Sequence, residues 1–405
     1  MQLELYSEPM ARQINQLYYI THIENLNSML DMGILSHEQV EARNIPFKRI
    51  YDESIVSSRQ LRTTPDGRSL WHFANLFFQA RNAMLYRITC EHSIDDIAVL
   101  GLRFDVVNHS ENFIALGNAA AGATDILPGQ LGLRQIPTLR ADFAREYWSD
   151  EDGSKRRMMA EVLVPDCVSP EYIQTIFVGS QAAAARAQNI VNRSALSPAP
   201  AVVVEPHMFF EPLRMIPITS NLVLEQGDLF FSRMQTLTVS VNTVGVMGKG
   251  LASRAKYQFP AVYVAYQDLC RKKTLRMGRP AVYKRETPFD LELADQPGTM
   301  EANGETWFLL FPTKRHWRDK ADFEGIEEGL AWLLQNYRSE GIQSLAMPAL
   351  GCGLGKLDWR DVGPLMCRYV SQMNIPVRIY LPAEKALDQE LLTPEFLLSS
   401  PATNG

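Results

Sequence analysis

Two glycine-rich stretches in the second half of the chain have residue types that suit phosphate binding. The first is Asn-Thr-Val-Gly-Val-Met-Gly-Lys-Gly at residues 242–250, and the second is Gly-Cys-Gly-Leu-Gly at residues 351–355. The backbone N–H groups of such loops attract anions, and glycine lets the backbone approach a ligand closely. Ordinary tight turns would also explain either loop alone. Together they predict one ligand that carries two phosphates.

A single glutamate interrupts an apolar run in the first half of the chain. Glu161 stands in Met-Met-Ala-Glu-Val-Leu-Val, residues 158–164. Because burying a carboxylate is costly, an acid in such a strand needs a reason. One reason is a satisfied ion pair, and the other is catalysis, with the carboxylate as a general base. The residue types leave both readings open.

Strands and helices alternate around the two glycine loops. Short β-branched and apolar runs lead into each loop, and amphipathic runs follow it, which predicts strand, loop and helix in turn. This alternation predicts an α/β sandwich around a mixed sheet in the second half. The predicted strands cover residues 222–226, 236–241, 307–311, 344–348 and 377–381, and the predicted helices cover residues 251–259, 261–269, 323–337 and 361–373.

Five prolines between residues 194 and 217 mark a boundary in the chain, because proline density of this kind breaks regular structure. A chain of 405 residues is also long for one core. We therefore expect a first domain at residues 1–210, a linker at 211–219, a second domain at 220–390 and a frayed polar tail at 391–405.

Composition narrows the class of protein further. The net charge of −6 argues against a protein that is basic throughout, although it allows a local basic groove. The five cysteines are scattered and form no C-x-x-C pair, which predicts free thiols in the cytoplasm. Neither the cysteines nor the seven histidines show zinc spacing, so no metal is expected. No apolar run reaches membrane-spanning length, so no membrane association is expected.

The motifs of the second half, taken together, resemble the macrodomain family, whose members bind ADP-ribose. These motifs are Gly227-Asp-Leu-Phe230, the loop at 242–250, and Pro348-Ala-Leu followed by the loop at 351–355. The resemblance is closest to DarG, an antitoxin that removes ADP-ribose from DNA, and it covers residues 221–382. It implies a three-layer α/β/α macrodomain with a mixed sheet.

This resemblance implies an ADP-ribose site on the two loops. Asp228 would accept a hydrogen bond from the adenine amino group, and Asn242 would lie near the first loop. The loops themselves would hold the diphosphate and the distal ribose. The residues implied in ADP-ribose binding are Asp228, Asn242, Val246, Met247, Gly248, Lys249, Gly250, Gly351, Cys352, Gly353, Leu354 and Gly355.

A lysine follows the predicted strand at residues 307–311, in the run Thr-Lys-Arg-His-Trp. In the resembling hydrolases the lysine in this place is catalytic, which implies that Lys314 acts on the anomeric carbon of the distal ribose. The alternative is that Lys314 only neutralises phosphate charge. Gly355 stands where animal relatives that act on proteins carry an aspartate, and this difference favours the DNA-directed branch.

Four stretches of the first half together resemble DarT, a family of NAD-dependent toxins that attach ADP-ribose to bases in single-stranded DNA. The stretches are residues 19–26, 84–86, 147–148 and 155–164. The resemblance spans residues 18–180 and implies an α+β ADP-ribosyltransferase-like domain. That fold binds NAD in a cleft without the Rossmann G-x-G-x-x-G motif, and none occurs in the first half.

The DarT resemblance also assigns roles in the first half. Glu161 would be the catalytic glutamate, and it would orient the NAD ribose and remove the proton of the base. Arg59 would hold an NAD phosphate and stabilise the transition state, with Arg62 and Arg49 as rivals for that role. The residues implied in NAD binding are Tyr19, Thr21, His22, Arg59, Phe77 and Met84.

Trp148, Arg156 and Arg157 are the implied DNA-binding residues, because single-stranded DNA is held by rings that stack on bases and cations that meet phosphates. The alternatives are a core position for Trp148 and a solvated turn for the two arginines.

The two resemblances together imply an α/β chain that fuses a DarT-like toxin to a DarG-like antitoxin. The first half would transfer ADP-ribose from NAD to a base in single-stranded DNA, with thymine preferred over guanine, and the second half would remove it. One alternative is a macrodomain that only binds ADP-ribose or inhibits the transferase, and another is an inactive first domain. The expected partners are single-stranded DNA, NAD and ADP-ribose, and the two domains are expected to interact.

Overall fold

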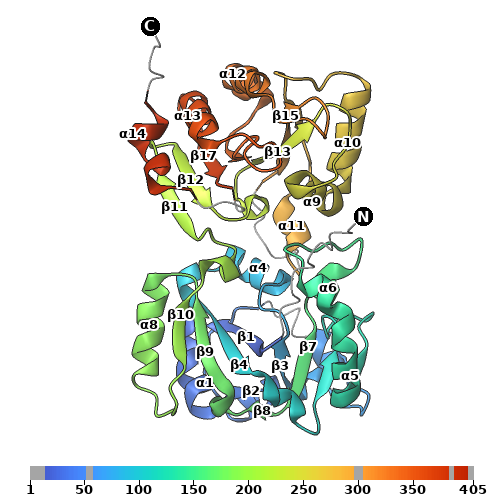
Figure 1. Cartoon of the computed structure of the whole chain (residues 1–405). Helices are drawn as coiled ribbons and strands as arrows, with labels where there is room; N and C mark the ends of the chain where they lie inside the picture. Colours follow the sequence, from blue (N-terminus) through green and yellow to red (C-terminus); the bar gives the residue numbers. More distant parts are fainter. Residues whose placement is uncertain (1–13, 52–57, 296–303, 383–386, 400–405) are drawn as a thin grey trace, which may run out of the picture. The chain divides into compact units, whose positions relative to one another are not determined.

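The chain forms two compact units in a computed structural model that describes residues 14–51, 58–295, 304–382 and 387–399 (Figure 1). Unit 1 comprises residues 1–210 together with residues 290–301, and unit 2 comprises residues 211–289 and 302–405. The chain thus leaves unit 2 once and returns to it. The described residues of this segment, 290–295, belong to unit 1 and not to the second domain, where the sequence pattern placed them.

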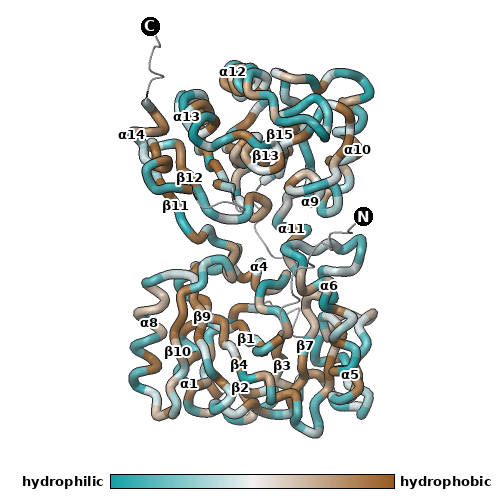
Figure 2. The backbone as a smooth tube through the Cα atoms, in the orientation of Figure 1, coloured by the Kyte–Doolittle hydropathy of each residue, from teal (hydrophilic) through white to brown (hydrophobic). Residues whose placement is uncertain are grey.

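An eight-stranded sheet forms the centre of unit 1, in the order β10-β9-β4-β1-β3-β7-β5-β6. Figure 2 shows strands β9 and β10 as largely hydrophobic. Strand β7 lies between β3 and β5, so Glu161 is opposite Phe77 on one side and Ala115 on the other. The strands are β1 (Gln16–His22), β3 (Phe73–Phe77), β4 (Ile97–Arg103), β5 (Phe113–Ala115), β6 (Ile126–Pro128), β7 (Glu161–Pro165), β9 (Ile173–Val178) and β10 (Ala201–Val204), with β2 (Ile34–Leu35) and β8 (Cys167–Val168) as a separate pair.

The alternation of side chains along β7 decides which face of the sheet carries Glu161. Val162 packs into the main core of the unit, whereas Leu163 packs into a smaller cluster with Phe73 and Phe113. Residues two apart in a strand share a face, so Glu161 lies on the side of the smaller cluster. The helices of the unit are α1 (Leu26–Met32), α2 (His37–Ala42), α4 (Ala83–Glu91), α5 (Gly129–Gln135), α6 (Arg140–Phe143), α7 (Ser154–Arg157) and α8 (Gln181–Val191).

Unit 2 is built on a seven-stranded mixed sheet, in the order β11-β12-β17-β16-β13-β15-β14. The five inner strands are parallel, and both edge strands are antiparallel to their neighbours. This arrangement confirms the expected mixed sheet. The strands are β11 (Arg214–Pro217), β12 (Leu222–Gln226), β13 (Thr236–Asn242), β14 (Ala281–Tyr283), β15 (Trp307–Lys314), β16 (Leu345–Pro348) and β17 (Val377–Tyr380).

Helices cover both faces of this sheet, which gives the three layers that the macrodomain resemblance implies. Leu309 and Phe311 of β15 pack into the cluster formed with helices α12 and α13. Phe308 points to the other face, where its ring lies 4.9 Å from that of Phe259, the residue at the junction of α9 and α10. The helices are α9 (Gly250–Gln258), α10 (Pro260–Arg271), α12 (Phe323–Glu340) and α13 (Trp359–Val370).

Two segments that were expected to be irregular form regular structure. The predicted linker at 211–219 contains β11, which pairs with β12 from Arg214 to Pro217, so this part of the linker prediction is wrong. The predicted tail at 391–405 begins with the end of a 3-10 helix (η10, Gln389–Leu392) and continues into α14 (Pro394–Leu397). These bury Leu391, Leu392 and Leu397 in the core of unit 2, so the fraying prediction is wrong up to residue 399, and residues 400–405 lie outside the described part.

Candidate active sites

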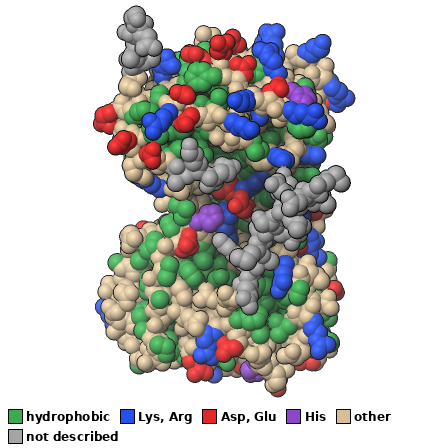
Figure 3. All heavy atoms as spheres, viewed as in Figure 1, with side chains coloured by type: hydrophobic (Ala, Val, Ile, Leu, Met, Phe, Trp, Pro, Cys, Tyr) green, Lys and Arg blue, Asp and Glu red, His purple; other side chains and the backbone are tan. Residues whose placement is uncertain are grey.

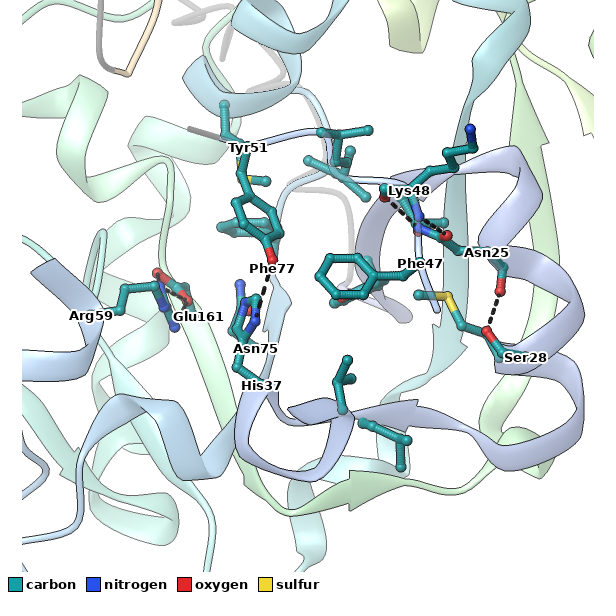
Figure 4. A pocket seen from close by; sticks show the side chains of 18 of the residues that line it. Asn25, Ser28, His37, Phe47, Lys48, Tyr51, Arg59, Asn75, Phe77 and Glu161 are labelled. Carbon is teal, nitrogen blue, oxygen red and sulfur yellow. Dashed lines mark hydrogen bonds and ion pairs between the residues drawn. The ribbon is translucent and has the colours of Figure 1, made fainter. Parts of the chain in front are cut away.

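Glu161 and Arg59 form an ion pair in unit 1 (Figure 4). Both Nη atoms of Arg59 lie 3.2 Å from Oε2 of Glu161, and Ala119 N–H donates a 2.8 Å bond to Oε1. The Glu161 side chain is 1% exposed and that of Arg59 is 12% exposed. The structure therefore confirms the ion pair expected of Glu161, and the paired acid also lines a pocket.

A pocket opens beside this pair, and its empty space is about 1170 Å³ including the open mouth. Both apolar and polar side chains line it, as in most sites for small molecules. Four residues expected to bind NAD line it, namely Tyr19, Thr21, Phe77 and Met84, as do Arg59 and Glu161. His22 is not among the lining residues. Its ring caps the short helix η1 (Ile23–Asn25) by accepting a bond from the N–H of Glu24, so the structure does not bring His22 together with the other residues expected at NAD.

One wall of this pocket, which was not predicted from the sequence, is formed by residues around Lys48. Asn25 precedes α1 and resembles an N-cap, yet its side chain makes no cap bond to the helix. Instead it accepts from Lys48 N–H at 2.7 Å and donates to the Lys48 carbonyl at 2.9 Å. This paired bond fixes the segment that brings Phe47 and Tyr51 to the pocket.

His37 is a second lining residue that the sequence did not single out. Its ring stacks on Trp71 at 4.5 Å and meets Tyr51 edge-on at 5.2 Å. Burial, together with the charges of Arg59 and Arg49, lowers the pKa of His37 to about 4. His37 is therefore neutral near pH 7 and presents an uncharged polar ring to the pocket.

Tyr19 is the lining residue at the centre of strand β1. Burial raises the pKa of Tyr19 to about 12, although the charge of Arg59 acts in the opposite direction. Its phenol therefore keeps its proton near pH 7 and can serve as a hydrogen-bond donor to a ligand.

Ala119, whose N–H donates to Glu161, lies in a loop that hydrogen bonds from two arginines hold in place. Arg62 donates to the carbonyl of Thr124, and Arg156 donates to its hydroxyl at 3.2 Å. The Arg156 carbonyl in turn accepts from the N–H of Asn118 at 2.9 Å. Arg62, the rival of Arg59 in the sequence, therefore contacts the loop, whereas Arg59 contacts Glu161 directly. Arg156 likewise fastens the loop in this structure.

Two of the side chains expected to bind DNA form hydrogen bonds to other residues of unit 1. Trp148 is 2% exposed, and its indole N–H donates to the carbonyl of Leu293 at 2.8 Å. A ring buried in this way cannot stack on a base, so the core alternative for Trp148 is the correct one. Arg157 forms a two-bond ion pair with Asp142, with bonds of 2.7 and 3.1 Å, and its side chain remains 29% exposed.

The segment that covers Trp148 is residues 290–295, which belong to unit 1 although they lie between two stretches of unit 2 in the sequence. There Asp290 accepts from the Tyr86 hydroxyl at 2.5 Å, and Asp295 accepts from Arg87 at 2.7 Å. Leu293 and the two aspartates are largely or wholly buried. Asp295 also lines the pocket that contains Glu161. The transferase-like unit is therefore completed by residues that follow it by about eighty positions in the sequence.

The candidate site of unit 2 lies at one edge of its sheet. Strands β13, β15 and β16 are parallel neighbours, so their carboxyl ends meet at the same edge. The loop at 242–250 follows β13, the loop at 351–355 follows β16, and Lys314 ends β15. Ligands of α/β proteins commonly bind at such an edge. The structure thus brings together the two loops and the lysine that the sequence singled out.

Asn242 organises the first loop from inside. Its side-chain oxygen accepts from the N–H of Val244 at 3.0 Å, and its amide donates to the carbonyl of Val246 at 2.6 Å. The Tyr266 hydroxyl lies 2.9 Å from the same oxygen. Asn242 is buried, so it shapes the loop, whereas Val246, Gly248, Lys249 and Gly250 are exposed for a ligand and Met247 is buried beneath them.

Lys314 connects the second loop to the strand edge. Its Nζ donates to the carbonyls of Leu354 at 3.3 Å and Asp319 at 3.1 Å. Leu354 and Gly353 are exposed, Cys352 is partly buried, and Gly351 adopts a φ of +73° that favours glycine. A Cβ at Gly355 would lie 2.4 Å from the carbonyl oxygen of Gly351, so this loop has no room for a side chain at position 355.

Asp228 follows strand β12 and accepts from the N–H of Phe230 at 3.1 Å. Its second oxygen accepts from Arg254 at 2.7 Å, and both side chains are mostly buried. The Arg254 guanidinium lies over the ring of Phe230 at 4.8 Å. The pair fixes the orientation of the carboxylate.

Neither a metal cluster nor a membrane-spanning helix occurs in the part of the chain that the structure describes. Within that part, His, Cys, Asp and Glu side chains form no group of three or more that could hold a metal ion. None of the described helices is both long and apolar enough to cross a bilayer. Acidic and basic side chains are intermixed on the face shown in Figure 3, in keeping with the modest net charge.

Each half of the chain matches a known protein family. Residues 18–210 match the family of DarT, single-stranded DNA thymidine ADP-ribosyltransferases, and residues 306–366 match the macro domain family. A DNA ADP-ribosyl transferase–DNA ADP-ribosyl glycohydrolase fusion protein of Thermosipho africanus is 50% identical over 96% of this chain and 100% of its own length.

Two further relatives agree with this assignment. The solved structure of Thermosipho africanus DarTG in complex with ADP-ribose matches 95% of this chain and 100% of its own, with a TM-score of 0.90 and 50% identity. A DNA ADP-ribosyl glycohydrolase of Thermus aquaticus is 36% identical over 39% of this chain and 41% of its own length. This chain belongs to the family of DNA ADP-ribosyl transferase–DNA ADP-ribosyl glycohydrolase fusion proteins.

Proposed function

We propose that unit 1 transfers ADP-ribose from NAD to thymidine in single-stranded DNA and that unit 2 removes it by hydrolysis. The observation that carries the first activity is the buried Glu161–Arg59 pair, which lines the pocket of unit 1. The observation that carries the second is the meeting of Lys314 with two glycine loops at one sheet edge. The family relationship supports both.

Glu161 is the general base of the proposed transfer. The bond between the ribose carbon and nicotinamide breaks, a bond forms from that carbon to the base, and the proton of the base N–H passes to Glu161. Arg59 and the N–H of Ala119 hold the carboxylate in one orientation, which leaves lone pairs for the ribose and the base. Tyr19, Thr21, Phe77 and Met84 would contact NAD.

Lys314 acts at the anomeric carbon in the proposed hydrolysis. The bond between the ribose and the thymine ring breaks, water supplies the new ribose hydroxyl, and the base regains its proton. The exposed N–H groups of the two loops, together with the N-terminus of α9, would bind the diphosphate. Asp228 would accept a hydrogen bond from the adenine amino group. Neither proposed step uses a metal.

A second candidate function for unit 2 is ADP-ribose binding without hydrolysis. It is favoured by the two bonds from Lys314 Nζ to backbone carbonyls, because these bonds also suit a lysine that merely fastens the two loops. In that case Lys314→Ala would lower ADP-ribose affinity, and wild-type protein would not release ADP-ribose from DNA.

The test of the proposal uses the full chain with Lys314→Ala, NAD and an oligonucleotide with one thymidine. We expect the variant to accumulate oligonucleotide carrying one ADP-ribose, and digestion with mass spectrometry to place it on thymidine. Wild-type protein should show less product at every time point. An oligonucleotide with guanine in place of thymine is the control for the base. Absence of product on any base would contradict the transferase assignment.

A further inference from the structure

A short turn after Lys314 carries basic and aromatic side chains on the surface of unit 2. From residue 314 to residue 322 there are four basic residues and two acidic residues, in a chain whose net charge is −6. Within this turn Trp317 is 48% exposed. Tryptophan is mostly buried in folded proteins, so an indole exposed beside a catalytic lysine suggests a ligand contact.

The turn is rigidly built, which keeps Trp317 at a fixed place relative to Lys314. The N–H of His316 donates to the Asp319 carboxylate at 3.0 Å, and the N–H of Asp319 donates back to the His316 carbonyl at 3.0 Å. The carbonyl of Arg315 accepts from both the N–H and the hydroxyl of Thr243, in the first glycine loop. Arg315 thus attaches the start of the turn to the first glycine loop.

A guanidinium and a second ring lie next to the exposed indole. The Arg318 guanidinium lies 4.5 Å from the centre of the Trp317 ring, and the His316 ring lies 5.3 Å away. Arg315 is 73% exposed and makes a 3.6 Å ion pair with Asp322, which is weak at such exposure. Asp319 directs its carboxylate to the backbone. The outward face of the turn therefore combines an aromatic ring with cations.

An aromatic ring flanked by cations is what a sequence-tolerant site for single-stranded nucleic acid requires, because rings stack on bases and cations meet phosphates. We propose that residues 315–320 form a DNA subsite of the glycohydrolase, in which Trp317 stacks on a nucleobase next to the modified one. Arg315 and Arg318 pair with the neighbouring phosphates. The inference rests on the proposed hydrolysis and names the part of its substrate that lies beyond ADP-ribose.

The position of the turn agrees with this role. Lys314 acts where the ribose joins the base, so the DNA strand must leave the site beside Lys314. Trp317 follows by three residues, which places it within about 11 Å along the chain. A strand that carries the modified base therefore passes within reach of the turn.

The test compares two substrates that differ only in flanking DNA. One is an oligonucleotide with ADP-ribose on an internal thymidine, and the other is the ADP-ribosyl-thymidine released from it by nuclease digestion. We expect full-length Trp317→Ala protein to lose about tenfold in kcat/KM on the oligonucleotide, the typical loss for one stacked base, and to keep its rate on the nucleoside. Trp317→Phe protein should keep most of the wild-type rate on the oligonucleotide, because phenylalanine still offers an aromatic ring.

Arg318→Ala should act through phosphate contact on the same substrate. The dependence of log kcat/KM on log salt should become shallower by about 0.7 for each lost phosphate contact with single-stranded DNA. Tyr257→Ala is the matched control, because Tyr257 is an exposed aromatic of the same unit that lies beside a cation, Lys256, but on helix α9. It should leave both substrates unaffected.

Two results would overturn the subsite. Equal rates of Trp317→Ala and wild type on the oligonucleotide would show that the ring does not contact DNA. Equal losses on the oligonucleotide and the nucleoside would show that Trp317 supports Lys314 or ADP-ribose itself. Failure of the underlying function looks different, since wild-type protein would then hydrolyse neither substrate.

Discussion

The two candidate sites hold their charged residues in opposite ways. In unit 1, Glu161 and Arg59 are buried and paired with one another. In unit 2, Lys314 is partly exposed and donates to backbone carbonyls, and the loops around it offer mainly backbone groups. A buried pair fixes a catalytic group before the substrate arrives, whereas an exposed lysine among backbone donors is suited to a large product that enters from solvent. The first site should therefore respond far more steeply to the loss of one side chain.

Glu161→Gln should give the largest effect. The amide cannot accept the proton of the base and loses its charge pairing with Arg59, so transferase activity should fall by about a thousandfold, within the range of general-base catalysis. The measurement is formation of ADP-ribosyl-oligonucleotide in a Lys314→Ala background. Hydrolysis of preformed product by the Glu161→Gln single variant is the control and should not change. A transferase rate above about a tenth of the original would contradict the role of Glu161.

Asp295→Ala tests how far unit 1 depends on its distant segment. Arg87 is fully buried, and Asp295 is its buried partner. Removal of Asp295 should destabilise unit 1 by about 3 kcal/mol, which is the lower end of the range for a broken buried ion pair. We expect the lower end because Glu91 still pairs with Arg87 in the variant. Urea unfolding of the full chain measures this, with transferase activity reporting on unit 1. Glu91→Ala is the matched control and should cost less, since Glu91 is more exposed. An unchanged midpoint for Asp295→Ala would mean that the segment does not stabilise unit 1.

Gly355→Ala tests the backbone character of the second site. A Cβ there would lie 2.4 Å from the Gly351 carbonyl oxygen, so the loop must shift. Overpacking of this kind costs about 1–3 kcal/mol, and we expect ADP-ribose to bind about tenfold more weakly in calorimetry. Gly304→Ala, where a Cβ would meet no atom within 4 Å, is the control. Unaltered affinity in Gly355→Ala would show that the loop tolerates a side chain.

His37 should give the smallest effect, on acid stability. Its pKa is near 6.5 in the unfolded chain and about 4 in unit 1, so the unfolded state binds more protons between these values. Stability should therefore fall as the pH is lowered from about 6.5 to about 4, and His37→Gln should make this fall shallower. Urea midpoints at several pH values measure the slope. An identical slope in both proteins would contradict burial of a neutral His37.

Unit 2 could be predicted closely from its sequence, because its site is local. Each loop directly follows a parallel strand, and parallel strands bring their carboxyl ends to one edge. The expected strand at residues 222–226 coincides with β12, and that at 236–241 differs from β13 by one residue. What the sequence did not reveal is how Asn242 acts, since its bonds to Val244 and Val246 depend on the path of the folded loop.

Unit 1 could be predicted less well, because its site is assembled from distant strands and from residues 290–295. Glu161 and Arg59 were both singled out, yet their pairing follows only from the fold. Trp148 was implied in DNA binding by the DarT resemblance, with a core position as the alternative, and the residue that accepts its bond, Leu293, lies far along the chain. His22 was implied in NAD binding by the same resemblance, whereas in the structure its ring caps a helix turn.

The most direct test of the central claim uses one labelled oligonucleotide and two variants of the full chain in sequence. Lys314→Ala protein with NAD is applied first, and after its removal Glu161→Gln protein is applied without NAD. We predict that the first step adds the mass of one ADP-ribose to the oligonucleotide and that the second step restores the original mass. If the first step adds nothing, or the second leaves the adduct in place, the chain does not combine the two activities in separate sites.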